Sequence, residues 1–299
     1  MPHALRKSVL TGVPVASAMR RQVVRGYVHT SLAGCINQMV KHKVGALLIM
    51  DEQERPAGVL SKTDLISAYY AMLPVETPVG DLVAAEPIFC YPDDHLEDAV
   101  DRMQSNGIHR VYVRGARIDQ VVGTLSYLDV VGLLYKYCRN CRRSMAVQRR
   151  READTAHRLR VDEVMSPTVH TCPSNAGLDK VIEILTTAGC GAALIVDDAN
   201  LPAGVISKTD LVLAYKHGLA IETRAVDILQ RPVLTCEAHT VLAKALQEML
   251  LQDIQRLFVH QDNPGNIVGV LSLSDSARFR SGSCRACTAG RLMTNSDSG

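Results

Sequence analysis

Four segments of the chain carry apolar residues at the spacing of an amphipathic helix. Within each segment they occupy positions i, i+3, i+4 and i+7, which lie on one face of a helix. These segments are 32–39, 96–103, 178–185 and 242–249. A short apolar run of strand length follows each segment, at 46–50, 111–113, 192–196 and 257–259. The pattern therefore predicts four copies of a helix followed by a buried strand.

A seven-residue stretch recurs after every predicted strand. Each copy starts with glycine, continues along a second strand and ends in Ser-x-x-Asp, where a second helix begins; the copies are 58–64, 123–129, 204–210 and 269–275. The glycines are 65 residues apart within each half of the chain, and the halves are offset by 146 residues. Short apolar lead-ins precede the helices, at 15–19, 79–83, 161–165 and 226–229. Each unit thus reads as lead-in, helix, strand, turn, strand and helix over about 60 residues.

The spacing of the copies describes a duplicated pair of units. A chain of 299 residues has room for about two domains of ordinary size, in agreement with the offset between the halves. We expect the first pair at 13–141, a basic linker with helical character at 142–160, the second pair at 161–287 and a disordered tail at 288–299. Because one unit cannot cover its own sheet, the units within each half are expected to pair.

The Ser-x-x-Asp turn has two interpretations. As a helix cap, the serine hydroxyl accepts from a first-turn amide and the aspartate lies at the positive end of the helix. As a ligand site, the free first-turn amides favour phosphate, and a carboxylate one turn away can accept both ribose hydroxyls. A single copy favours the cap. A nucleotide would satisfy both groups at once.

Basic residues near these turns fit the second interpretation. Lys62 and Lys208 lie within the first and third copies, whereas Arg110 and Arg256 stand at the head of the preceding strand in the second and fourth. Each of these charges alone is more often a solvated surface group. The candidate nucleotide-binding residues are Ser61, Lys62, Thr63, Asp64, Arg110, Ser126, Asp129, Ser207, Lys208, Thr209, Asp210, Arg256, Ser272, Ser274 and Asp275.

The unit length, the lead-in, the Gly-x-x-Ser-x-x-Asp turn and the paired spacing resemble the cystathionine β-synthase (CBS) domain. The stretches 108–113 and 271–275 are also similar to segments of the gamma subunit of AMP-activated protein kinase. The resemblance covers about residues 13 to 281. It implies an α/β fold of four βαββα repeats, arranged as two Bateman modules whose sheets pack across a pseudo-two-fold axis.

The resemblance also implies clefts that bind AMP-, ADP-, ATP- or S-adenosyl-type ligands. The four aspartates would contact ribose and the four serines would lie beside phosphate. In the first and third copies Gly45 and Gly191 stand one residue before the strand, where the even copies carry a basic strand head, so Lys62 and Lys208 would have to supply the charge. Occupancy of each cleft does not follow from the resemblance, because many clefts in the family are empty.

Two C-x-x-C pairs follow the last helix of each half. They are Cys138 with Cys141 and Cys284 with Cys287, again 146 residues apart. Four thiolates could hold zinc or an iron–sulfur cluster if the halves bring their ends together. Disulfides, redox-active thiols and structural thiols remain alternatives. The other cysteines, at 35, 90, 172, 190 and 236, are expected to be small apolar core residues.

The composition and motifs argue against several classes of protein but do not select a single function. The chain has 33 basic and 31 acidic residues, and it contains no Trp. The start carries no apolar stretch of signal-peptide length, and no run approaches a membrane span, which favours a cytoplasmic protein. Scarce aromatics argue against stacking on single-stranded nucleic acid. The ten histidines form no H-E-x-x-H pattern, and no P-loop occurs, so no enzyme constellation stands out.

Three functions remain at this point. The first is a regulatory protein that senses adenine nucleotides and signals to a separate partner protein, as a monomeric disc or a homodimer. The second is a thiol- or metal-dependent redox sensor that uses the C-x-x-C pairs. The third is nucleic-acid binding through the arginines between 139 and 160. For this segment we prefer the simpler interpretation of a solvated basic helix that joins the modules.

Overall fold

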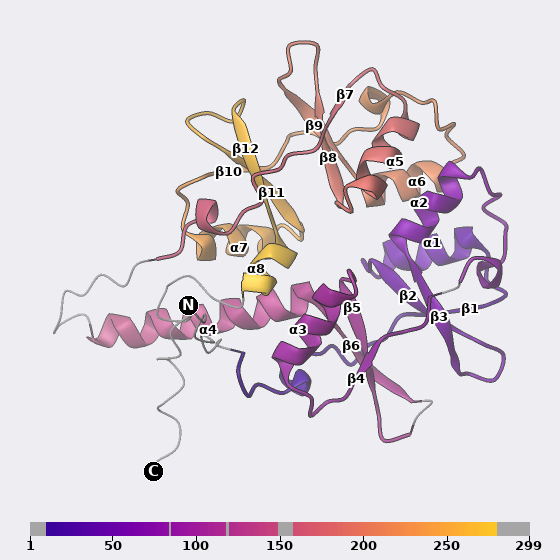
Figure 1. Cartoon of the computed structure of the whole chain (residues 1–299), viewed down its shortest axis with the longest axis horizontal. Helices are drawn as coiled ribbons and strands as arrows, with labels where there is room; N and C mark the ends of the chain where they lie inside the picture. Colours follow the sequence, from indigo (N-terminus) through magenta and orange to yellow (C-terminus); the bar gives the residue numbers. More distant parts are fainter. Residues whose placement is uncertain (1–9, 84, 118–119, 149–157, 280–299) are drawn as a thin grey trace, which may run out of the picture.

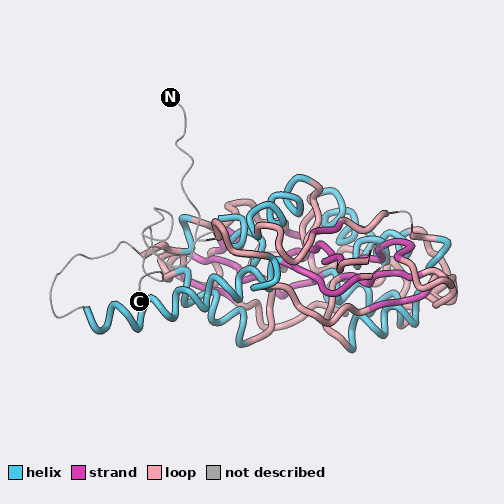
Figure 2. Tube along the Cα trace, turned by 90° about the horizontal axis from the view of Figure 1, so that it is seen from below, coloured by secondary structure: helices cyan, strands magenta, loops and turns pink. Residues whose placement is uncertain are grey.

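The protein forms a flat ring of four similar units. A computed structural model describes residues 10–83, 85–117, 120–148 and 158–279, with side chains omitted from 138 to 148. Around the ring in the face view the order is first, second, fourth and third unit (Figure 1), and the edge view shows a body much thinner than it is wide (Figure 2). In the described residues no helix is long and apolar enough to cross a membrane.

Each unit has the order β, α, β, β, α that the CBS resemblance implies. The first unit contains β1 (Arg25–Tyr27), α1 (Leu32–Lys41), β2 (Ala46–Met50), β3 (Pro56–Ser61) and α2 (Lys62–Tyr70). The second contains β4 (Phe89–Cys90), α3 (Leu96–Ser105), β5 (Arg110–Arg114), β6 (Val121–Ser126) and α4 (Tyr127–Gln148). The third contains β7 (Thr171–Pro173), α5 (Leu178–Thr187), β8 (Ala192–Val196), β9 (Pro202–Ser207) and α6 (Lys208–Lys216). The fourth contains β10 (Thr235–Glu237), α7 (Leu242–Leu251), β11 (Arg256–His260), β12 (Ile267–Ser272) and α8 (Leu273–Phe279).

Every unit builds one mixed three-stranded sheet. Its first two strands pair in parallel through the intervening helix, and the second and third strands form an antiparallel hairpin. A parallel pair requires such a crossover, whereas a short turn suffices for the hairpin. The helix with the predicted apolar face lies in that crossover, and in α1 this face is fully buried at Leu32, Cys35, Ile36 and Met39. The α/β fold predicted from the sequence is confirmed.

Pairing occurs both within and between the halves. Within each half the sheets face one another through small clusters: Leu48, Met50, Tyr112 and Val121 in the first half, and Leu194, Val196 and Phe258 in the second. The two largest cores instead join units of different halves. One unites the helices of the first and third units, where α2 packs on α6, and the other unites the second and fourth, where α4 packs on α8. Pairing within each half was predicted from the sequence, whereas pairing between the halves was not.

The lead-ins pack on the neighbouring unit rather than on their own. The Val15 amide donates to the Asp94 carbonyl at 2.9 Å, and its side chain lies in the core of the second and fourth units. Reciprocally, the Val79 amide donates to the Thr30 carbonyl at 2.8 Å, and its side chain belongs to the core of the first and third units. Val161 and Ala225 repeat the exchange in the second half. The four lead-ins therefore tie each pair of units together.

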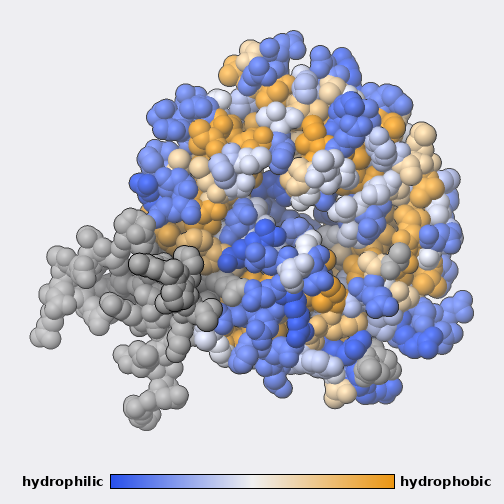
Figure 3. Space-filling view, viewed as in Figure 1, coloured by the Kyte–Doolittle hydropathy of each residue, from blue (hydrophilic) through white to orange (hydrophobic). Residues whose placement is uncertain are grey.

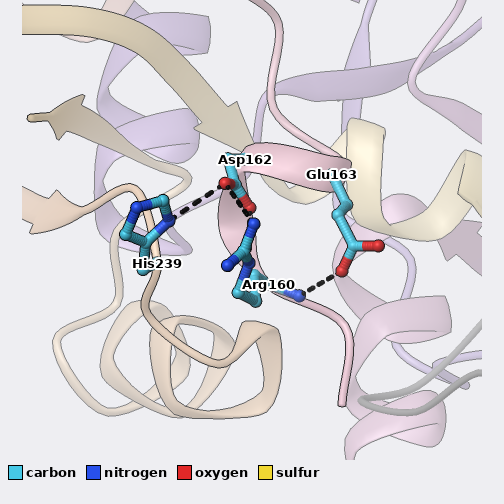
Figure 4. A network of polar contacts seen from close by, with 4 residues as sticks. All are labelled: Arg160, Asp162, Glu163 and His239. Atoms are coloured by element: carbon cyan, nitrogen blue, oxygen red, sulfur yellow. Dashed lines mark hydrogen bonds and ion pairs between the residues drawn. The ribbon is translucent and has the colours of Figure 1, made fainter. Parts of the chain in front are cut away.

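Ion pairs hold the lead-in of the third unit in place. The Asp162 carboxylate accepts from the Arg160 guanidinium at 3.0 and 3.2 Å, and it lies 3.1 Å from His239 Nδ1 in the fourth unit. The Arg160 amide donates to the Glu163 carboxylate at 3.0 Å. Figure 4 shows the four side chains around this short turn. The contact with His239 links the start of the third unit to the fourth.

The glycine that starts each seven-residue copy lies against an exchanged lead-in. A Cβ atom at Gly123 would stand 2.7 Å from the Arg20 carbonyl oxygen, and one at Gly269 would stand 2.7 Å from the Ser166 carbonyl oxygen. The same holds at Gly204, where the Gln230 carbonyl oxygen would be 2.8 Å away. Glycine is needed here because the lead-in forms a backbone bridge with the strand, as between Arg20 and Thr124.

Replacement of Gly123 by alanine is expected to lower the free energy of unfolding by about 1–3 kcal/mol, because the new methyl group meets backbone that cannot turn aside. Gly132→Ala is the matched control, since a Cβ atom there meets nothing within 4 Å and the residue lies inside α4. We expect that variant to gain about 0.5–1 kcal/mol. Urea unfolding measures both values, and equal effects would contradict the packing described for Gly123.

Candidate functional site

All four Ser-x-x-Asp turns form helix caps. In the first copy Asp64 Oδ2 accepts from the Ser61 amide and from the Ser61 hydroxyl, each at 2.7 Å. The other three copies repeat the pair of bonds at 2.6–2.9 Å, between Ser126 and Asp129, Ser207 and Asp210, and Ser272 and Asp275. The aspartate thus caps the start of the helix in every copy, and the predicted bond from a first-turn amide to the serine hydroxyl is present at Asp64 and Asp275, at 3.4 and 3.2 Å. In the first and third copies the cap engages one carboxylate oxygen, Oδ2, so the other oxygen can still face a ligand.

The second and fourth copies have additional contacts. Asp129 Oδ1 pairs with the Arg20 guanidinium, which reaches it from the exchanged lead-in. In the fourth copy the Ser272 and Ser274 hydroxyls lie 2.7 Å apart. Arg20 was absent from the predicted set, because no local pattern places residue 20 beside residue 129. With both of its oxygens engaged, Asp129 is the least available of the four aspartates for a ribose.

The lysines of the first and third copies each reach the turn of the other copy, in the neighbouring unit. Lys62 Nζ donates to Thr209 Oγ1 at 2.7 Å, and Lys208 Nζ donates to Thr63 Oγ1 at 2.8 Å. The two contacts are reciprocal because α2 and α6 start side by side where the first and third units meet. Each lysine therefore contacts the turn of the other odd copy, an arrangement that was not predicted from the sequence.

The strand heads are asymmetric between the halves. A Cβ atom at Gly191 would stand 2.1 Å from Arg256 Nη2, so the guanidinium of the fourth unit lies directly over the strand head of the third. Gly45 occupies the equivalent place in the first unit, and a Cβ atom there would meet nothing within 4 Å. The third unit has no basic residue at its strand head. Because Gly191 stands there without a side chain, Arg256 of the neighbouring fourth unit can occupy the space.

The charges of these groups act on one another. Burial and the positive charges of Arg110 and Arg256 lower the pKa of Lys62, while Asp210 opposes the shift. Burial likewise lowers the pKa of Lys208, and Arg256 contributes while Asp64 opposes. Burial also lowers the pKa of Arg256 itself. We call Lys62, Arg110, Lys208 and Arg256 the central cation cluster. Its members come from all four units.

His109 and Arg278 lie beside the central cation cluster and were absent from the predicted set. Withdrawal from water, then the charges of Arg278, Lys208 and Arg256, lower the pKa of His109. The His109 ring meets the Tyr127 ring edge-on at a centroid distance of 5.6 Å, and the Arg278 guanidinium lies 5.5 Å from the same Tyr127 ring. The adjacency of His109 to Arg110 was a usable signal, whereas Arg278 is placed only by the packing of α8 on α4.

The face of the ring is hollowed near its middle, and hydrophilic residues lie beside the hollow (Figure 3). A separate shallow surface pocket contains none of the predicted site residues and is lined by Pro202, Ala203, Arg231, Pro232, Val233, Thr235 and Pro264.

The cysteines divide into three groups. Cys35, Cys90, Cys172 and Cys236 are buried free thiols, as predicted. Cys190 is partly buried and packs against the core of the first and third units. Burial raises its pKa, and the charges of Lys208 and Arg256 oppose that shift. The predicted metal ligands Cys138, Cys141, Cys284 and Cys287 have side chains outside the described part. Within that part no three His, Cys, Asp or Glu side chains cluster as metal ligands would.

Two solved structures are similar to most of this chain and support the fold. The uncharacterized protein MJ1225 of Methanocaldococcus jannaschii is 23% identical over 203 residues, which span 68% of this chain and 69% of that protein. Its crystal structure, described as that of a candidate archaeal homologue of γ-AMPK, matches 89% of this chain and 99% of its own with a TM-score of 0.74 at 15% identity. An uncharacterized conserved protein of Pyrococcus horikoshii matches 90% of this chain and 100% of its own with a TM-score of 0.58, also at 15% identity.

A third structure is a shorter protein with a ligand. The CBS domain protein PAE2072 of Pyrobaculum aerophilum, solved in complex with AMP, covers 39% of this chain and 89% of its own at 26% identity and a TM-score of 0.37. A family model decides the membership. The model of the CBS domain matches residues 15–71, 79–136, 161–217 and 225–275, which together exceed half of the chain. The protein therefore belongs to the CBS-domain family, with four copies of the domain.

Proposed function

We propose that this protein binds adenine nucleotides beside its Ser-x-x-Asp turns, with the phosphates on the central cation cluster, and that occupancy is signalled to a separate protein. The observation that carries the proposal is the convergence of Lys62, Arg110, Lys208 and Arg256 from four units. Burial lowers the pKa of three of them, and repulsion from neighbouring arginines adds to the shift at the two lysines. An anion placed there would relieve that repulsion. A phosphate ester supplies the charge, and its ribose supplies hydroxyls for an aspartate.

The turns support a ligand of this kind. Asp64 and Asp210 each commit Oδ2 to the cap, which fixes the orientation of the carboxylate before a ligand arrives. A preorganised acceptor binds a ribose diol at a lower entropic cost than a mobile one. The charge of each carboxylate also reaches the lysine of the opposite copy, as the pKa values of Lys62 and Lys208 show. The same aspartate can therefore touch ribose while phosphate lies on the lysines.

The resemblance to the CBS family adds the regulatory part of the proposal. The four matched copies of the domain occupy most of the chain, so we propose that a bound ligand acts through a separate protein. We propose no catalytic reaction for the described residues, because their polar groups are engaged in caps and cation contacts rather than in a nucleophile–base pair. Zinc or iron binding by the C-x-x-C pairs remains a prediction that metal analysis of the purified protein would test.

The double variant Asp64→Ala, Asp210→Ala tests the ribose contacts. We expect AMP binding, measured by isothermal titration calorimetry, to weaken about 100-fold, because two charge-assisted hydrogen bonds at each site are lost. The variant also loses two capping boxes, which costs about 1 kcal/mol each, so a thermal melt must show that it is folded at the titration temperature. Asp129→Ala is the matched control, since Arg20 already engages that carboxylate. Unchanged affinity in the double variant would remove the odd sites from the proposal.

The pKa of His109 predicts a pH dependence. Because this pKa is lowered from 6.5, His109 is neutral at pH 7 and gains its charge only in more acidic solution. The added charge should tighten binding of an anion by about threefold as the pH falls through this lowered pKa, since water screens part of the attraction. Adenosine 5′-sulfate is the suitable probe, because its sulfate does not titrate in this range. His109→Gln should abolish the increase; an identical pH profile in that variant would exclude His109 from the site.

A further inference from the structure

One hydroxyl in the first half is buried without a partner. Tyr112 lies in β5 and is 2% exposed, with its ring packed against Leu48, Met50 and Val121 between the two sheets. Its hydroxyl makes no hydrogen bond to any residue of the described part. A buried hydroxyl without a partner opposes folding, and native proteins seldom retain one without a use.

The second half shows that packing does not require this hydroxyl. Phe258 occupies the equivalent position, two residues after Arg256, as Tyr112 is two residues after Arg110. Phe258 is 3% exposed and packs with Leu194 and Val196 between the sheets of its own half. An aromatic ring therefore fills the same place in both halves, and only the first half adds an oxygen to it.

Tyr112 lies next to the central cation cluster. Residues i and i+2 of a strand point to the same face, so the side chains of Arg110 and Tyr112 share one face of β5. Burial raises the pKa of the Tyr112 hydroxyl to about 12, and the charge of Arg110 acts on it in the opposite direction. A ligand with its phosphate on Arg110 would thus have its nucleoside part on the side where Tyr112 lies.

The strand heads give the first half the space that a ligand needs. The position of Gly45 is open, whereas the equivalent position in the second half is covered by the guanidinium of Arg256. The half with the open strand head is also the half with the unpartnered hydroxyl. These two observations come from different residues and point to the same module.

We propose that the Tyr112 hydroxyl donates a hydrogen bond to the nucleoside part of a nucleotide bound in the first module, and that the second module, with Phe258, lacks this contact. The inference rests on the proposed function and adds a specificity-determining residue to it. Its acceptor is a sugar oxygen or a ring nitrogen, and the phosphates play no part in this bond. The two modules of one chain would then differ in their preference among nucleotides.

Tyr112→Phe tests the proposal because it copies the second half into the first. We expect the ligand-free variant to melt a few degrees higher, since an unsatisfied buried hydroxyl is removed, and to bind AMP about tenfold more weakly at one class of site. Binding of inorganic pyrophosphate, which has no nucleoside, should be unchanged. Phe258→Tyr is the reciprocal control and should lower the melting temperature without weakening AMP binding.

The outcomes separate this proposal from the one it rests on. If Asp64→Ala weakens AMP binding and Tyr112→Phe leaves it unchanged, the role of Tyr112 is wrong and the proposed function stands. If Tyr112→Phe weakens AMP and pyrophosphate equally, the hydroxyl acts on the cluster rather than on a nucleoside, and the proposal is again overturned. If the unmodified protein binds no AMP, both proposals fail.

Discussion

Replacing Lys62 and Lys208 together by methionine is expected to weaken AMP binding at least about 100-fold and, at the same time, to raise the melting temperature of the ligand-free protein. Two effects of opposite sign follow from one cause. Burial and the neighbouring arginines lower the pKa of both lysines, so their charged forms cost free energy in the empty protein. A bound phosphate would attract the two lysines, and each charge-assisted hydrogen bond would contribute about 1.5–3 kcal/mol to the free energy of binding.

The sign of the stability change follows from the direction of the pKa shifts. A lysine whose folded pKa is lowered binds its proton less tightly than in the unfolded chain, so protonation favours unfolding at every pH below its unfolded value. The penalty declines as the pH rises above the lowered pKa and vanishes at the unfolded value. Neutral pH lies below the unfolded value, so removing both charges should stabilise the ligand-free fold. The lost bonds to Thr63 and Thr209 reduce this gain.

A control with the same change in net charge isolates the position of the lysines. Lys41 and Lys244 are exposed on α1 and α7. The double variant Lys41→Met, Lys244→Met should bind AMP as the unmodified protein does. Calorimetric titration and thermal melts of the two double variants decide the matter. A ligand-free Lys62, Lys208 variant that loses stability and keeps its AMP affinity would show that the lysines are structural.

Gly191→Ala is expected to reduce AMP affinity about tenfold, whereas Gly132→Ala should leave it unchanged. The added methyl group at residue 191 would stand 2.1 Å from Arg256 Nη2, so the guanidinium must leave its place over the third strand head. Loss of one arginine–phosphate contact accounts for a change of about this size. A Cβ atom at residue 132 meets nothing within 4 Å, and this residue lies inside α4, which makes it a control for the same chemical change.

Stability should distinguish displacement of Arg256 from damage to the fold. Because the colliding atom is the far end of a flexible side chain, Gly191→Ala should change the melting temperature little. Sulfate titration would show whether the loss is confined to the anion. Equal affinities in the two glycine variants would mean that Arg256 takes no part in binding at this strand head.

The elements of the fold were predictable because each depends on nearby residues. Apolar spacing at Leu178, Val181, Ile182 and Leu185 marks the buried face of α5, and the Ser-x-x-Asp turn marks the start of every second helix. The exchange of lead-ins was not predictable. Val15 lies in the core of the second and fourth units because of packing between segments about eighty residues apart, which no local pattern records.

The candidate site was predictable in its parts and not in its assembly. Lys62, Lys208, Arg110 and Arg256 are recognisable in the sequence from their places beside the repeated turn. Their partners depend on α2 and α6 starting side by side, so the crossing of the lysines required the tertiary structure. The ion pair between Arg20 and Asp129 likewise results from the exchanged lead-in. The role of Gly191 follows from the position of Arg256 over it, which the sequence does not indicate.

The most direct test of a phosphate-reading cluster is a comparison of AMP with adenosine by calorimetric titration of the unmodified protein at low salt. The two ligands share base and ribose and differ only in the phosphate. We predict saturable AMP binding at least about 100-fold tighter than adenosine binding, since the phosphate would contact several buried cations. Equal affinities for the two ligands, or no binding of AMP, would contradict the account.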